Sequence, residues 1–349
     1  MAEGGGGHEG PRTAALPAIT SEDFDALYAE WAALHAAVPG ATPFQHPAFL
    51  AAWLRAESGK SETEGGDSAG SRAFLAVYEG EALVGVAPLE LDVAQATTLG
   101  DPNVADYGPL LAAAGKEAVV AAGVLEWLLE DLTPALEVWG LAEGSPVRAA
   151  FAAAAEGFGW GCEEELEAVA PRLALEGTFA GYVASLAKHD RHELRRKLRR
   201  LEAAGAVRYE SFGQSGEVEA RMGRFLALMH ASDAKDGFLT TRMEEFFRDL
   251  AASFSALGML RLGVLTLDGA EVAMVLCFED TETAYLYNSG YDPAHAGLAV
   301  GLLSKAYAIQ EAATRGKRTF DFLRGDEDYK RRLGGRPVSI WRLRLTQGR

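Results

Sequence analysis

The segment 320–332, FDFLRGDEDYKRR, concentrates side chains that could do chemistry. Asp321 stands between two phenylalanines in an apolar run, and the alternation of a strand would place its carboxylate on a polar face or in a cleft. Loops that follow strands commonly contact ligands, and four polar side chains follow here: Arg324, Asp326, Tyr329 and Lys330. The pattern indicates a ligand-contacting cluster or, alternatively, a surface network of ion pairs.

A glycine-rich segment, Gly290–Gly301 (GYDPAHAGLAVG), joins an expected strand to an expected helix. Free backbone N–H groups at a helix N-terminus can bind an anion, and glycines allow a ligand to approach the main chain. The segment therefore predicts an anion site, although an ordinary strand-to-helix turn has the same composition.

A basic segment, 188–202, carries seven basic and three acidic residues. At 100° per residue, three leucines share one helix face and four cations occupy the adjacent flank: Lys188, Arg191, Arg195 and Arg199. Guanidinium groups offer forked donors that suit phosphate or pyrophosphate. A solvated surface helix is the alternative interpretation.

Several common catalytic motifs are missing from the sequence, among them the P-loop, the GxSxG nucleophile elbow and the HExxH zinc motif. His189 and His192 have the spacing of metal ligands, but five Arg and Lys residues in the next eight positions would repel a cation. We therefore expect no metal, no phosphotransfer from ATP and no serine hydrolysis.

The elements that must position these residues follow from hydrophobic periodicity. Apolar spacings of three and four predict helices around residues 24–34 and 49–54, and residues 73–92 predict a β-hairpin. A helix at about 115–131 and a short strand near 136–141 follow. We expect residues 1–12 and 58–71 to be disordered because they lack apolar side chains almost completely.

The second half of the chain repeats this order. We expect helices at about 179–203, 217–235, 241–257 and 298–315, a hairpin around Asp268-Gly269, and strands at RTFDFL and VSIWRLRL. Helices followed by antiparallel strands and a strand–helix–strand unit are typical of an α+β fold. The matching hairpins of the two halves suggest a duplication.

Length and charge limit the class of protein. A chain of 349 residues predicts two domains, and no apolar run is long enough to span a bilayer. The net charge of −17 argues against binding to DNA. The first residues lack the features of a secretory signal and there are two cysteines, so we expect a cytoplasmic protein.

Three stretches closely resemble the CelD/BcsL-like acetyltransferase family of the GNAT superfamily, which is related to the Fem-type aminoacyltransferases: HDRHELRRKLRRLEAAG, YNSGYDPAHAGLAVGLLSKAYAIQEA and RTFDFLRGDEDYKRRLG. The upstream segment TLGDPNVADYGPLL is similar to the family's first lobe. The resemblance implies two tandem GNAT-like lobes, each a mixed, mainly antiparallel sheet flanked by helices. We place a disordered N-terminus at 1–15, one lobe at 16–170 and a donor-binding lobe at 171–349.

The resemblance also implies acetyl-CoA or another acyl-CoA as co-substrate, held by the turn that leads into the helix at about 298–315. The GNAT frame Q/R-x-x-G-x-G/A falls on Ala294, Gly297 and Ala299, so its leading Arg or Gln is missing. We hypothesise that Arg191, Arg195 or Arg324 replaces it. The expected donor contacts are completed by Gly290, His295, Leu298 and Gly301.

An N-acetyltransferase of this kind needs a base for the attacking ammonium and an acid for the leaving thiolate. We expect Asp321 to be the base and Tyr287 or Tyr329 the acid, and we expect Asp106, Tyr107 and Lys330 to face the acceptor. The acceptor is an amine of a small molecule, saccharide or peptide, and neither its identity nor the oligomeric state follows from the sequence.

Two other functions remain open at this stage. A Fem-type transferase would take an amino acid from aminoacyl-tRNA to a cell-wall precursor, but the acidic total charge disfavours tRNA. A non-catalytic GNAT-like ligand-binding protein would explain the incomplete donor frame.

Overall fold

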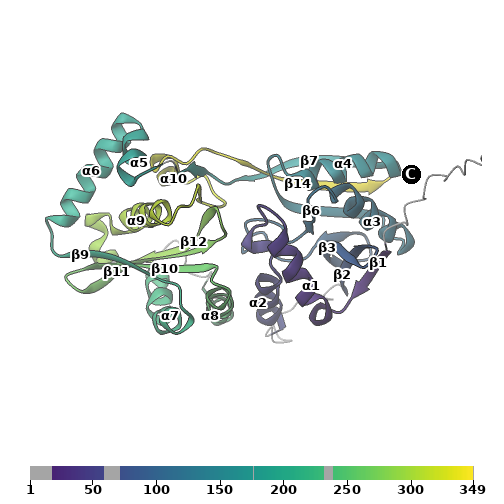
Figure 1. The fold of residues 1–349 in the computed structure, drawn as a ribbon, viewed down its shortest axis with the longest axis horizontal. Coiled ribbons are helices and arrows are strands. Elements are labelled where there is room, and N and C mark those ends of the chain that lie inside the picture. Colours follow the sequence, from purple (N-terminus) through teal and green to yellow (C-terminus); the bar gives the residue numbers. More distant parts are fainter. Residues whose placement is uncertain (1–17, 59–70, 176, 232–238, 349) are drawn as a thin grey trace, which may run out of the picture.

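The computed structural model describes residues 18–58, 71–175, 177–231 and 239–348, and it forms two lobes that each contain one mixed sheet (Figure 1). The expected α+β fold of two GNAT-like lobes is therefore confirmed. The segments expected to be disordered, 1–12 and nearly all of 58–71, lie outside the described residues. None of the described helices is long and apolar enough to cross a membrane.

The sheet of the first lobe has the order β1-β2-β3-β4-β6-β14-β7, and β5 pairs with β3. Alternate residues of β2 and β3 point to opposite faces, so Ala76 and Val86 pack toward α1 and α2, whereas Leu75 and Ala87 pack toward α3 and α4. The strands are β1 (Ala18–Glu22), β2 (Ser71–Glu79), β3 (Ala82–Leu91), β4 (Ala96–Thr98), β5 (Leu111–Ala112), β6 (Ala135–Ala142), β7 (Trp160–Val169) and β14 (Ser339–Gln347). The helices are α1 (Phe24–Ala37), η1 (Pro43–Gln45), α2 (Pro47–Ser58), α3 (Glu117–Glu130) and α4 (Pro146–Phe158).

The sheet of the second lobe has the order β8-β13-β12-β11-β10-β9. Helices α7 and α8 cover one of its faces, and α5, α6 and α9 cover the other. Its strands are β8 (Arg172–Ala174), β9 (Val207–Phe212), β10 (Leu260–Leu267), β11 (Ala270–Glu279), β12 (Thr283–Tyr291) and β13 (Thr319–Asp321). Its helices are α5 (Phe179–Ser185), α6 (Lys188–Glu202), α7 (Ser215–His230), α8 (Thr241–Ala256), η3 (Pro293–Leu298), α9 (Val300–Thr314) and α10 (Asp328–Arg332).

The last strand crosses back to the first lobe. β14 lies between β6 and β7 and is antiparallel to both, as the long ribbon along the upper edge of Figure 1 shows. A division of the chain at residue 170 therefore does not separate the two sheets, because residues 339–347 belong to the first. Periodicity within the strand could not indicate this, since it does not show which sheet the strand joins.

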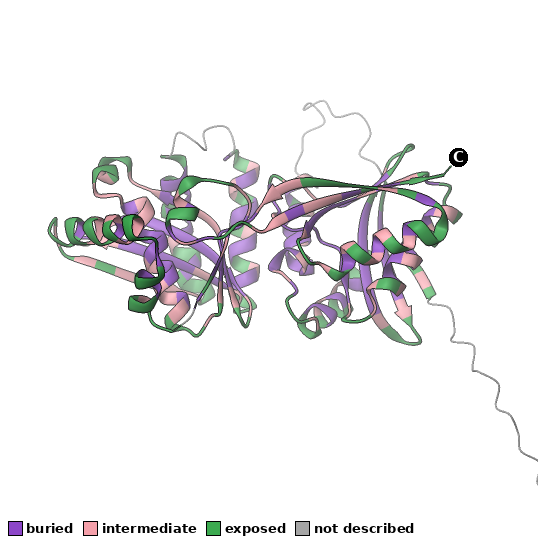
Figure 2. Ribbon diagram, turned by 90° about the horizontal axis from the view of Figure 1, so that it is seen from above, coloured by how far each residue is buried: buried purple, intermediate pink, exposed green. Residues whose placement is uncertain are grey.

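The two lobes share one hydrophobic core. The cluster that contains Phe44 and Phe49 of the first lobe continues to Phe246 and Phe278 of the second. α2 packs against α8, and Figure 2 shows buried segments in both lobes on either side of the junction. The relative position of the lobes, and hence of any site between them, is set by this packing.

Both expected hairpins are present. β2 pairs with β3 and β10 with β11, each antiparallel with one register shift. Asp268 and Gly269 both have positive φ, of 50° and 84°, which two-residue hairpin turns require and which Gly and Asp tolerate. The helix expected at 179–203 is divided into α5 and α6 by Leu186 and Ala187, whose backbone is extended.

Candidate functional site

Two neighbouring strands of the second sheet, β12 and β13, diverge after a short paired segment and so form a splay. β12 and β13 run parallel and pair from Thr283/Thr319 to Tyr285/Asp321. β12 then continues to Tyr291, whereas β13 ends at Asp321 and the chain leaves the sheet as the loop 322–327. The carboxyl ends of parallel strands at such a point commonly border a ligand site.

One cavity of about 250 Å³ lies where β12 leads into α9. It is lined by Tyr291, Ala296, Ala299, Gly301, Leu302, Lys305 and Tyr329. No side chain caps the N-terminus of α9. The Leu302 and Leu303 N–H groups donate to the Ala299 carbonyl, so the N–H groups of Val300 and Gly301 and the positive end of the helix dipole are left for a ligand. The Lys305 ammonium donates to the Gly301 carbonyl at 2.8 Å and adds a positive charge. This is the turn for which the sequence predicts an anion site.

The backbone conformation and close packing of this turn restrict which residues it can contain. Ala299 has a φ of 58°, in the left-handed region, and ends η3 where α9 begins. A Cβ at Gly301 would approach the Tyr291 ring to 2.8 Å. Gly301 is therefore needed for the contact between α9 and the end of β12, which forms one wall of the cavity.

A second cavity of about 350 Å³ lies between the lobes. The first lobe contributes Asp106 and its neighbours, and the second contributes β12 and the loop after β13; the lining is Pro102, Asn103, Val104, Asp106, Tyr287, Asn288, Arg324 and Gly325. Tyr287 and Asn288 stand three to four residues before Tyr291 on β12, so the two cavities are separated by about 10–13 Å along one strand.

The pKa of the Asp106 carboxyl differs from that of an exposed aspartate. Desolvation raises the pKa of its carboxyl to about 7, and the hydrogen bond from the Arg324 backbone opposes this shift only in part. Oδ1 accepts that N–H at 2.7 Å, whereas Oδ2 has no hydrogen bond to any residue that the structure describes. The carboxyl can therefore exchange a proton near neutral pH.

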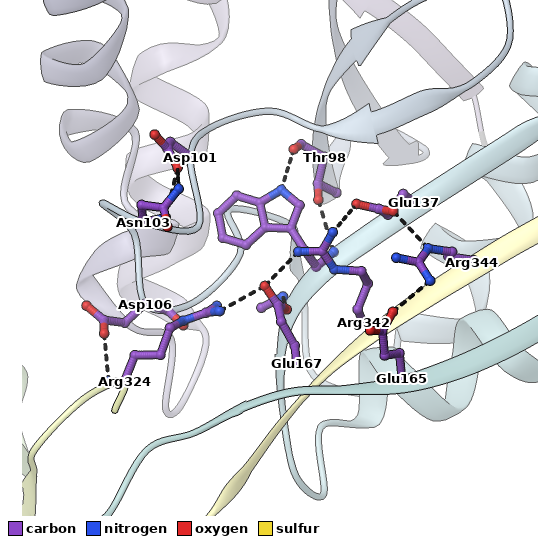
Figure 3. A network of polar contacts seen from close by, with 12 residues as sticks. Thr98, Asp101, Asn103, Asp106, Glu137, Glu165, Glu167, Arg324, Arg342 and Arg344 are labelled. Carbon is purple, nitrogen blue, oxygen red and sulfur yellow. Dashed lines mark hydrogen bonds and ion pairs between the residues drawn. The ribbon is translucent and has the colours of Figure 1, made fainter. Parts of the chain in front are cut away.

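Ion pairs connect this cavity to the C-terminal strand (Figure 3). The Arg324 guanidinium donates to the Asp106 carbonyl at 3.1 Å and to Glu167 of β7 at 2.8 Å, and Glu167 also accepts from Arg342 of β14 at 2.9 Å. Burial opposes ionisation of Glu167, but hydrogen bonds from Arg324, Gly140 and Arg342 keep its pKa below the usual value. Arg324 is thus committed to the lobe junction and does not line the cavity at α9.

Asp321 is completely buried and held by protein groups. Oδ2 accepts from the Tyr107 hydroxyl and from Arg172 Nε, both at 2.8 Å, and Oδ1 accepts from the Leu323 N–H at 2.8 Å. Desolvation raises its pKa, and Arg172 counteracts this. Asp321 lines neither the α9 cavity nor the interlobe cavity, so the geometry gives it a positioning role in place of the expected role as base.

Lys330 is also used for positioning. It is 2% exposed, and its ammonium donates to the carbonyls of Leu323, Arg324 and Gly325 and to Glu327. Its three protons are therefore occupied within the protein. They hold the loop that borders the interlobe cavity, instead of facing an acceptor as expected.

The expected donor residues are only partly brought together. Ala299 and Gly301 line the α9 cavity, whereas His295 pairs with Asp292 and Leu298 packs in the adjacent core. Gly297 is exposed and does not line the cavity.

Gly290 belongs to a packing contact and not to the cavity. A Cβ at this position would lie 2.5 Å from the backbone of Leu228 and Met229 in α7. Arg191 donates to the carbonyls of Ala184 and Leu186 at the end of α5, and Arg195 is exposed.

Two tyrosines lie where an acid would be needed. The Tyr287 hydroxyl donates to the Val104 carbonyl at 3.0 Å, and burial raises its pKa well above the usual value. Tyr329 lines the α9 cavity, and burial raises its pKa too. Tyr107 packs in the junction and borders a further cavity of about 360 Å³ in the first lobe, together with Arg172.

Sequence reasoning missed three charged residues of this region: Arg172, Glu167 and Lys305. Lys305 looks like any helix lysine, and its position one turn after Gly301 was the signal that could have identified it. Arg172 and Glu167 lie far along the chain from their partners, so no local pattern marks them.

Comparisons with known proteins agree with this architecture. Residues 188–331, about two fifths of the chain, match a family described as acetyltransferase (GNAT) domain. FemX has a TM-score of 0.63 at 12% identity, with 93% of this chain and 96% of that chain covered. A conserved protein of unknown function from Bacteroides thetaiotaomicron VPI-5482 has a TM-score of 0.62 at 11% identity, with 94% and 99% covered. No curated protein matches the sequence.

The matched region contains the splayed strands, α9 and its cavity, so the similarity to the GNAT acetyltransferase domain lies in the second lobe. The fold is that of two GNAT-like lobes, and the second of them is similar to the GNAT acetyltransferase domain. The narrower resemblance to the CelD/BcsL-like family stays a prediction.

Proposed function

We propose that the protein transfers an acyl group from a phosphopantetheine thioester, such as acetyl-CoA or another acyl-CoA, to an amine acceptor. The observation that carries the proposal is the pair of cavities along β12, one at the uncapped start of α9 and one at Asp106 between the lobes. An acyl transfer between two substrates needs two neighbouring binding sites, and β12 contributes residues to both cavities.

The donor phosphate binds at the start of α9. The Val300 and Gly301 N–H groups and the Lys305 ammonium provide positive potential there, and the small Ala299 and Gly301 leave room for the ligand. Lys305 takes the part that we had assigned to Arg191, Arg195 or Arg324. The pantetheine arm then follows β12 toward the interlobe cavity.

The acceptor amine binds in the interlobe cavity beside Asp106. As the carboxylate, Asp106 removes a proton from the ammonium, and the freed amine attacks the thioester carbonyl. The new C–N bond forms, the C–S bond breaks, and the thiolate leaves with a proton supplied by Tyr329, which burial keeps protonated. The amide and the free thiol are the products.

The donor site is tested by calorimetric titration with acetyl-CoA and with CoA. Ala296 is exposed and lines the cavity, so Ala296→Glu places a negative charge at its entrance without a clash. We expect both ligands to bind the parent protein and to bind this variant at least about 10-fold more weakly. Ala294→Glu is the matched control, because Ala294 is exposed on the same 3-10 helix but does not line the cavity.

Equal affinity in all three proteins would place the ligand elsewhere. If neither ligand binds the parent, the donor is not CoA, and transfer from aminoacyl-tRNA becomes the function to test. Binding without release of thiol in the presence of any amine would favour a non-catalytic ligand-binding protein.

A further inference from the structure

We infer that the acyl donor is presented by an acidic carrier protein that docks on α6, so that only the phosphopantetheine arm enters the α9 cavity. The inference rests on the proposed thioester transfer and adds the identity of the group that carries the thioester. It is drawn from the charges of α6, from the position of this helix and from the composition of the cavity.

The exposed side of α6 carries unpaired cations. Arg196 and Lys197 pair with Glu193, and Arg191 caps α5. Among the residues that the structure describes, the remaining four cations form no ion pair or hydrogen bond, and all four are exposed: Lys188, Arg195, Arg199 and Arg200. Lys188, Arg195 and Arg199 are spaced by seven and four residues, so they form one stripe along the helix.

The helix that carries this stripe adjoins two elements that line the α9 cavity. α6 packs against η3 and α9, and Ala296 of η3 lines the cavity. Leu194 and Leu201 anchor the helix in the core of the second lobe, which fixes its position. Figure 1 shows α6 at the outer edge of this lobe, away from the lobe junction, where a large partner could approach it.

The α9 cavity contains less positive charge than the neighbouring helix α6. Lys305 is the one cation among the seven residues that line the cavity, while four unpaired cations stand on the neighbouring helix. The leading Arg or Gln of the GNAT phosphate turn is replaced by Ala294. This division fits a ligand that places one phosphate inside the cavity and most of its negative charge on the surface beside α6. Phosphopantetheine attached to an acidic protein is such a ligand.

The charge balance favours an acidic protein over a nucleic acid. α6 has a formal charge of +4 in a chain of −17, so the remainder carries −21. A long polyanion would extend past the roughly 22 Å of this helix, and the remainder of the chain, with its net negative charge, would repel it. A compact carrier whose acidic face contacts one helix would avoid that repulsion, and complementary charges of this kind mainly accelerate association and select the partner.

The experiment measures binding of the full chain to a phosphopantetheine-loaded acyl carrier protein, to the same carrier without the arm, to CoA and to bulk tRNA. The α6 variant is Lys188→Glu/Arg195→Glu/Arg199→Glu. The control is Arg72→Glu/Arg248→Glu/Arg336→Glu, which reverses three exposed cations outside α6 and changes the net charge equally.

We expect the α6 variant to bind the loaded carrier at least about 10-fold more weakly than the parent, and the control to stay within about two-fold. CoA affinity should stay within about two-fold in all three proteins, because the changed residues do not line the cavity. The carrier without the arm should bind more weakly than the loaded form, and raising the salt concentration should weaken both.

Three results would overturn the inference: equal weakening by the two triple variants, no carrier binding by a protein that still transfers from acyl-CoA, or α6-dependent binding of tRNA alone. The second result would leave the proposed acyl transfer intact. Failure of the proposed function itself is different, because then no thioester, free or carrier-bound, would bind or release thiol.

Discussion

At the scale of single residues, the environment of each carboxyl group decides its role. Asp106 and Asp321 both have a raised pKa because of desolvation. They differ in their partners, since Asp321 accepts three hydrogen bonds from the protein whereas Asp106 has one oxygen exposed to a cavity. The sequence correctly indicated that Asp321 is unusual, because a carboxylate rarely stands in an apolar strand. A buried residue that anchors neighbouring groups needs the same position, so the pattern did not distinguish this role from that of a base.

Asp106→Asn should lower the rate of acyl transfer by about 100-fold or more, because a general base is lost. The base acts as the carboxylate, so the parent's rate should fall as the pH drops through the Asp106 pKa of about 7. The variant should lose this step. A pH–rate profile from 5 to 9 measures both effects.

Asp321→Asn is the contrasting variant. It keeps the shape of the side chain but weakens the pairing with Arg172, so stability and rate should fall. The step in the pH–rate profile should remain but move to lower pH, because the charge of Asp321 helps to raise the Asp106 pKa. A step that vanished in Asp321→Asn and persisted in Asp106→Asn would return the role of base to Asp321.

At the scale of elements, helices and hairpins followed from the sequence and the pairing of distant strands did not. α8 and the β10–β11 hairpin lie where apolar spacing and Asp268-Gly269 indicate. β7 was not predicted, because half of its residues are exposed and GCEEELEAV lacks the apolar alternation of a half-buried strand. Its partner, β14, is distant in sequence, which no local pattern can reveal.

Gly290 and Gly297 were expected to serve the same donor site, and the structure separates them. Gly290→Ala should lower the free energy of unfolding by about 1–3 kcal/mol, because its Cβ would meet the α7 backbone at 2.5 Å. Gly297→Ala should change it by less than about 0.5 kcal/mol, since no atom lies within 4 Å of the new Cβ. Urea unfolding measures both. Equal effects would contradict the packing role of Gly290.

At the scale of the whole molecule, the lobes are joined by a shared core, by ion pairs and by a strand. Arg55 pairs with Asp249 and Arg242 with Glu57, each at 2.7 Å across the α2–α8 contact. Two lobes could be expected from the chain length and from the repeated order of elements. Their fusion through β14 could not, because it depends on which open position in a sheet a strand occupies.

We therefore expect the two lobes to unfold in one transition. All six tryptophans lie in the first lobe or in β14, so fluorescence reports on the first lobe while far-ultraviolet circular dichroism reports on both. The two signals should give the same midpoint in urea. Separate midpoints would show that the shared core does not couple the lobes.

Leu343→Ala tests the contribution of β14. Leu343 is fully buried in the core of the first lobe, so its truncation should cost about 2–5 kcal/mol and move both signals together. Leu166→Ala, at a half-exposed position on neighbouring β7, is the control and should change stability by less than about 0.5 kcal/mol.

The crossing of β14 also has a consequence during synthesis. Until residues 339–347 have left the ribosome, β6 and β7 each present an unpaired edge, although every other strand of their sheet has already been made. Such edges can pair with other chains. Of the two lobes, the one translated first is therefore the last to be completed, and a nascent chain of this protein stays exposed to aggregation until the second lobe and β14 have been synthesised.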